Sequence, residues 1–139
     1  MGFNPKKRGR PSYQPLLCFE GKTGDVWEGI YLSGDIHPAP HTIGILEKSI
    51  SKLPSGVREI RVRADSAFYD HTIAEYLQDV PAFYAIVARI TKPIQRYVAG
   101  LSYQEAFPGF WLSEFEYKPW RWRTAQRFVV VRRLIPEKP

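Results

Sequence analysis

Cysteine, long apolar runs and nucleotide-binding motifs are the scarce features of this 139-residue sequence. Its single cysteine, Cys18, cannot form an internal disulfide, and its place in the apolar run PLLCF is typical of a small buried residue in a reducing compartment. No apolar run approaches the roughly 18–20 residues that span a bilayer, so we expect no membrane partner. The chain has no P-loop, no dinucleotide-binding glycine motif and no Gly-x-Ser-x-Gly elbow. These absences argue against a membrane protein, a P-loop nucleotidase and an α/β-hydrolase.

Acidic residues are scarce near both ends of the chain, where basic residues gather. The net charge is +6, and the first ten residues contain four basic residues and no acidic one. Six more lie between Lys118 and Arg133, a span without any acidic residue, whereas residues 14–117 contain nine basic and thirteen acidic residues. Two basic ends around an acidic centre favour a polyanionic partner, most simply nucleic acid. The alternative is that these charges are only solvated surface groups.

The pattern of apolar residues predicts a mixed α/β domain with a strand-rich C-terminal part. We expect an extended basic arm over 1–15, a core over 16–101 and a strand-rich segment over 102–139. Within these regions the spacing predicts a hairpin around 21–25, a loop at 37–41, helices near 43–53, 71–80 and 94–101, and strands near 60–65 and 82–90. The continuous apolar run at 82–90 is typical of a strand covered on both faces. The fold class is therefore α/β, with a mixed sheet, flanking helices and a strand-rich segment after them.

Asp65 closes the alternating stretch IRVRAD, which predicts a strand ending on a carboxylate. From position alone, a turn-forming aspartate is the favoured interpretation, and Asp70 is the expected N-cap of the helix that follows. The functional alternative is a metal ligand, since phosphodiester chemistry commonly uses two Mg²⁺ ions held by oxygen ligands. Such a site needs about three carboxylates from different elements, so Asp65 alone is a weak signal. The histidines show no zinc-site spacing, and His37 and His41 are separated by prolines.

The N-terminal segment KKRGRPSY resembles an AT-hook, in which an extended chain places two arginines in the narrow minor groove of A·T-rich DNA. The candidate DNA contacts here are Lys6, Lys7, Arg8 and Arg10. Gly9 would let the backbone approach the groove floor. The alternative is a basic arm that contacts phosphates or has no partner.

A second candidate nucleic-acid surface combines aromatic and basic residues near the C-terminus. Its tryptophans are Trp111, Trp120 and Trp122, and its basic candidates are Arg121, Arg123, Arg132 and Arg133. Such clusters can stack bases and contact phosphates. For the rings we favour a role in the core of the strand-rich segment, and the role of the arginines stays open.

Several segments in the same order resemble bacterial insertion-sequence transposases of the DDE type, group 1. These segments are NPKKRGRPSYQPLLCFEGKTGDVWEG, LPSGVREIRVRADSAFYD, YAIVARI and RFVVVRR, so the resemblance covers nearly the whole chain. It implies a ribonuclease H-like fold with a strand-rich insertion, DNA as the partner at transposon ends, and Mg²⁺- or Mn²⁺-dependent strand cleavage and transfer. It also implies a cytoplasmic, nucleoid-associated bacterial protein.

The resemblance assigns Asp65 as the second of three catalytic, metal-binding carboxylates. The first would precede the segment that begins at Asn4, and the third would lie in a Tyr-x2-Arg-x3-Glu-x6-Lys signature, but none of the eight tyrosines has an arginine three positions later. Ala67 stands where the family usually has glycine. We therefore expect a partial ribonuclease H-like core, marginal in stability and inactive alone. The alternative is a non-catalytic DNA-binding module that uses Arg8-Gly9-Arg10, associates with itself or with intact transposase subunits, and inhibits them.

Overall fold

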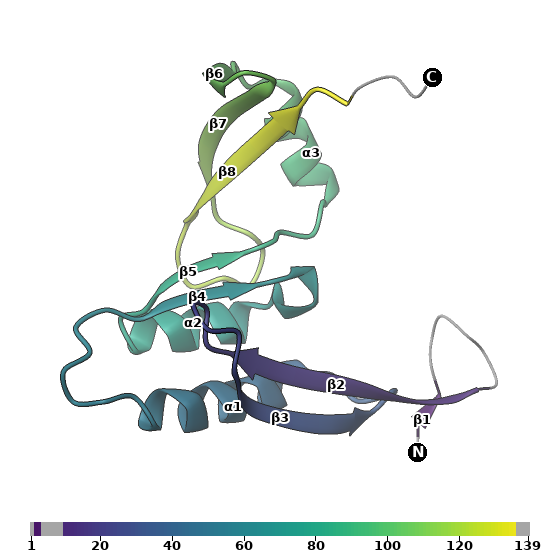
Figure 1. Cartoon of the computed structure of the whole chain (residues 1–139). Helices are drawn as coiled ribbons and strands as arrows, with labels where there is room; N and C mark the ends of the chain where they lie inside the picture. The colour runs from purple at the N-terminus through teal and green to yellow at the C-terminus, as the bar shows by residue number, and fades with distance from the viewer. Residues whose placement is uncertain (1, 4–9, 136–139) are drawn as a thin grey trace. The chain divides into compact units, whose positions relative to one another are not determined.

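The computed structural model describes residues 2–3 and 10–135, which form two compact units, Met1–Ala88 and Arg89–Pro139 (Figure 1). The elements are β1 (Gly2–Phe3), β2 (Pro11–Phe19), β3 (Val26–Ser33), α1 (Ala39–Ser51), β4 (Arg61–Ala64), α2 (His71–Asp79), β5 (Phe83–Ile86), α3 (Lys92–Ala99), β6 (Gln104–Phe107), β7 (Phe110–Tyr117) and β8 (Gln126–Arg133). These described elements give three helices and three small sheets, so the mixed α/β class is confirmed. No helix among the described residues is long and apolar enough to cross a membrane.

The first unit contains the predicted hairpin, in which β2 and β3 pair antiparallel, and the short β1 pairs with the other edge of β2. The Glu20 carboxylate stabilises the turn of this hairpin, because it accepts hydrogen bonds from the amides of Lys22 and Thr23 at 2.9 and 2.6 Å. Residues 11–15 of the predicted extended arm belong to β2, which begins at Pro11. Proline is tolerated there since a strand terminus does not need every amide. The rest of the predicted arm, residues 4–9, lies outside the described residues.

The core of the first unit forms between α1, α2 and the inner face of β4–β5. Leu46 from α1 meets Ile73 and Leu77 from α2, and these side chains are 8%, 2% and 0% exposed. Helix α1 starts earlier than the predicted residue 43, so the loop expected over 37–41 is wrong in its second half. The reason is that proline fits the first helical turn, where the missing amide has no intrahelical partner.

Strands β4 and β5 form a parallel two-stranded sheet, with Arg61 opposite Phe83 and Ala64 opposite Ile86. The expectation that the strand near 82–90 is covered on both faces was wrong. Phe83 is 65% exposed, whereas Ile86 packs against the core, because the helices of this unit cover one face only. The expected single mixed sheet is also divided, since among the described residues β2–β3 and β4–β5 are separate sheets.

The second unit combines α3 with the antiparallel sheet β6–β7–β8. Tyr97 of α3 stacks on Phe115 of β7 with ring centroids 4.9 Å apart, and Phe115 stacks on Phe128 of β8 at 5.1 Å. Gly109, with φ of +81°, lies in the turn between β6 and β7, where glycine tolerates this conformation. The strand-rich C-terminal part is therefore confirmed, and its interior is aromatic.

Candidate functional site

Asp65 lies directly after β4, at the carboxyl end of the parallel pair. Its Oδ1 accepts a hydrogen bond from the Ala67 amide at 2.8 Å and so caps the short 3-10 turn Ser66–Phe68. The residue is exposed, and Oδ2 has no hydrogen-bond partner among the residues the structure describes. The turn-forming role inferred from position is thus confirmed. One carboxylate oxygen nevertheless remains able to accept a further ligand.

A metal site of three carboxylates does not form around Asp65 within the described part of the chain. No group of three His, Cys, Asp or Glu side chains occurs there. The next aspartate, Asp70, is used as the predicted N-cap of α2, with its Oδ1 accepting from the Thr72 amide at 2.8 Å. The described residues therefore do not fit a two-Mg²⁺ centre, which needs ligands from several elements.

The cap also sets the electrostatics of Asp70. Burial alone would raise its pKa, but hydrogen bonds from the Thr72 hydroxyl and amide outweigh burial, and His71 and His37 add a smaller attraction. The net effect lowers the pKa of Asp70 below its ordinary value. Its carboxylate is therefore held in the ionised form that caps the helix.

The excess positive charge belongs to the second unit. Residues 89–139 contain ten basic and four acidic residues, whereas residues 1–88 contain ten of each. Trp120 is 80% exposed, and the Arg121 guanidinium lies 4.4 Å from the centre of its ring. The expectation that the tryptophan rings are core residues is wrong for Trp120, because this residue lies in the turn between β7 and β8, outside the sheet.

The remaining basic candidates differ in their surroundings. Arg132 lies over the Tyr103 ring at 3.7 Å, and Arg133 is exposed at the end of β8. Arg123 and Arg10 are exposed as well. The candidates Lys6, Lys7 and Arg8 lie outside the described residues. The structure thus brings Arg121 and Arg123 into one turn, on a strongly basic unit, with an exposed tryptophan between β7 and β8.

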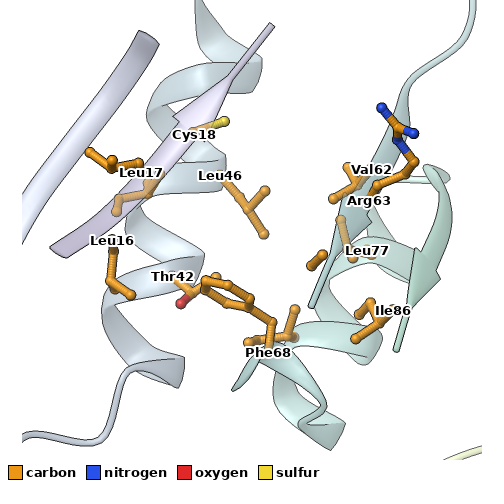
Figure 2. A pocket seen from close by; sticks show the side chains of 13 residues that line it. Leu16, Leu17, Cys18, Thr42, Leu46, Val62, Arg63, Phe68, Leu77 and Ile86 are labelled. Atoms are coloured by element: carbon orange, nitrogen blue, oxygen red, sulfur yellow. The ribbon is translucent and has the colours of Figure 1, made fainter. Parts of the chain in front are cut away.

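A hollow between β2 and β4 was not located by sequence reasoning (Figure 2). It is lined on one side by Leu16, Leu17 and Cys18, and on the other by Val62, Arg63 and Ala64, with Leu46 and Leu77 among the apolar side chains around it. The sequence indicated a partial core but did not show where a hollow would lie. The side chains that line this hollow are mainly apolar.

Comparison with known proteins gives no identification. No protein-family model, no curated protein and no solved structure matches the chain.

Proposed function

We propose that this chain is the central part of a DDE-type DNA transposase, in which Asp65 occupies one of the three catalytic carboxylate positions. The observation that carries the proposal is the exposed Asp65 carboxylate at the carboxyl end of β4, beside the parallel strand β5. In open α/β sheets, ligands and reacting groups gather at this edge. The ordered resemblance of long segments to such transposases adds the reaction class.

The order of elements supports a partial ribonuclease H-like core for the first unit. An antiparallel hairpin is followed by a helix, a strand, a second helix and a second strand parallel to the first. The strand-rich second unit corresponds to the insertion that the resemblance implies. Within the described residues, the sheet of this partial core is divided between the strands β1–β2–β3 and β4–β5.

Asp65 can offer one oxygen to Mg²⁺ or Mn²⁺, and such an ion would stabilise charge on the attacking and leaving oxygens of a phosphodiester. In the described part of the chain, Asp65 does not belong to a group of three side chains that could hold a metal ion. We therefore assign DNA binding to this chain in isolation, and strand cleavage to an assembly that completes the site.

A plasmid-nicking assay tests this division of roles. Supercoiled plasmid incubated with the isolated chain and Mg²⁺ or Mn²⁺ should stay supercoiled, because one carboxylate cannot hold both ions. Asp65→Ala should behave identically, as should Asp35→Ala, a control at an exposed aspartate of the loop after β3. Robust nicking that Asp65→Ala abolishes and Asp35→Ala retains would contradict the proposed inactivity. DNA flanking the coding segment should encode a carboxylate-bearing strand upstream and a glutamate-bearing helix downstream.

The second candidate function is a non-catalytic DNA-binding module that associates with intact transposase subunits and inhibits them. The excess basic charge of the second unit and the exposed Trp120–Arg121 pair favour it. Loss of binding to an A·T-rich duplex in an Arg8→Ala/Arg10→Ala variant would support the AT-hook arm as the contact. Unchanged affinity in that variant would place the contact elsewhere, with Arg121 and Arg123 as the next candidates.

A further inference from the structure

The sheet of the second unit has two edges that differ in length and regularity. The β6 edge is four residues long, its register with β7 shifts between Glu105 and Phe107, and Pro108 follows it. The β8 edge is eight residues long, pairs with β7 without a register shift and contains no proline. Proteins protect sheet edges from further pairing by short strands, bulges and proline. The β6 edge has these protections, whereas the β8 edge does not.

The β8 edge carries backbone groups that the described sheet does not use. The Leu134 amide donates to the Gly109 carbonyl at 2.9 Å, so the even-numbered residues of β8 point their backbone groups toward β7. Because this direction alternates along a regular antiparallel pair, the amides and carbonyls of Arg127, Val129 and Val131 point away from β7. Among the described residues β8 pairs with β7 alone. Three residues therefore offer both a donor and an acceptor to a further strand.

The side chains of β8 also favour pairing along its central part. Val129 and Val131 are 55% and 58% exposed, and branched side chains are well suited to strands. Arginine is itself a common protection of sheet edges, but the Arg127 guanidinium is already paired with the Glu114 carboxylate, with Nε 2.8 Å from Oε2. The middle of the strand is thus apolar, and the charge nearest to it is neutralised within the same copy.

A second copy of β8 can pair antiparallel with the first about a two-fold axis, and charge selects the register. With Val130 opposite itself, Arg127 would face Arg133, and like charges directly opposite are destabilising. A shift by two residues sets Val129 opposite itself and Arg127 opposite Val131, so that no two arginines face each other within the strand. Larger shifts in either direction shorten the paired segment. The register centred on Val129 is therefore favoured.

We propose that the β8 edge is a self-association surface, on which β8 of a second copy of this chain pairs antiparallel with Val129 opposite Val129. The two three-stranded sheets then form one continuous sheet, and the outward amides and carbonyls of Arg127, Val129 and Val131 are bonded between the copies. Each copy has one long regular edge, so the assembly closes at two copies. The proposal goes beyond the assignment of DNA binding and does not rest on it.

The charge of the second unit sets the salt dependence of this dimer. Residues 89–139 contain ten basic and four acidic residues, so two copies repel each other at low salt. One pair of strands is a small interface, and we expect a Kd on the order of 100 µM at 0.1 M salt. Screening at 1 M salt should tighten it at least roughly threefold, whereas salt weakens DNA binding. Sedimentation equilibrium measures both values, and a 16.1-kDa monomer at about 1 mM chain in both salts would overturn the proposal.

Disulfide formation between the copies tests the register. In a Cys18→Ser background, Val129→Cys places two thiols on residues whose Cα atoms are about 5.5 Å apart, a distance that a disulfide spans. The matched Val131→Cys variant holds its thiols about 13 Å apart along the strands, because Val131 faces Arg127. Diamide accepts the two electrons and two protons that the thiols lose as the disulfide forms. Val129→Cys should cross-link roughly tenfold faster, and equal rates or a faster Val131→Cys would contradict this pairing.

Hydrogen exchange gives a second readout that needs no substitution. With free monomer at about ten times Kd, exchange of the Val129 and Val131 amides should be roughly tenfold slower than in dilute protein. The Val130 amide, which points toward β7, should exchange at the same rate at both concentrations. Val129→Lys should abolish the concentration effect by setting two ammonium groups opposite each other, whereas the β-branched control Val129→Thr should retain it. Exchange of Val129 and Val131 that does not depend on concentration would refute the pairing.

Discussion

Truncation of Leu77 should be far more costly than the same truncation at Leu17. Leu77 is fully buried in α2 against the core, whereas Leu17 on β2 is 46% exposed. Leu77→Ala removes three carbons, which at about 0.8 kcal/mol each give about 2.4 kcal/mol of lost transfer free energy. The space left behind adds to this loss, but Leu77 already lines the hollow between β2 and β4, so part of that space joins an opening. We therefore expect the free energy of unfolding to fall by about 3 kcal/mol.

The matched Leu17→Ala variant should lose about 1 kcal/mol, because its side chain is already half in solvent and leaves no cavity. Urea titrations followed by circular dichroism would measure both losses. At a slope near 2 kcal/mol per M, Leu77→Ala should lower the midpoint by about 1.5 M and Leu17→Ala by about 0.5 M. Leu77→Met, which conserves volume, should lose less than about 1.5 kcal/mol. Equal midpoints for the two alanine variants would refute the assignment of the core.

Two further changes test local features of the first unit. Asp70→Ala should cost about 1 kcal/mol through the loss of the α2 cap, whereas Asp70→Asn should retain most of the capping. Because the pKa of Asp70 is lowered in the folded state, its contribution is complete above the unfolded value near 3.8 and is lost as pH falls through the lower folded value. The free energy of unfolding of Asp70→Asn should therefore depend less on pH below about pH 4 than that of the unchanged protein. An identical pH profile for the two proteins would contradict the cap. Gly44→Ala should stabilise α1 by about 0.5–1 kcal/mol, since an added Cβ at this helical position meets nothing within 4 Å. Thermal unfolding would reveal a higher midpoint, and a lower one would indicate that α1 is misassigned.

The sequence predicted most elements because their signals are local. The 3.6-residue spacing of Leu46 and its neighbours indicates α1, the alternation that ends at Asp65 indicates β4, and Asp70 marks the start of α2. Features that depend on distant contacts were less predictable. The exposed face of Phe83 reflects that the described helices of its own unit cover only the other side of β5, which an apolar run cannot reveal.

The candidate site shows the same difference between local signals and long-range contacts. The position of Asp65 at a strand end and its role in a turn could both be predicted from neighbouring residues in the sequence. Whether other carboxylates approach it is a matter of tertiary structure. The hollow between β2 and β4 likewise involves residues far apart in the chain, so its position became visible only in the assembled unit.

The most direct test of the central claim, a DNA-binding transposase core, is the salt dependence of affinity for a fluorescent 30-base-pair duplex. Anisotropy titrations should show binding that weakens linearly in log Kd against log salt concentration. Arg121→Ala/Arg123→Ala should reduce the magnitude of that slope by about 2, because each phosphate contact contributes about 0.9. Arg58→Ala/Arg61→Ala, which removes the same charge from the neutral first unit, should leave the slope unchanged. Absence of DNA affinity even at low salt would contradict the account.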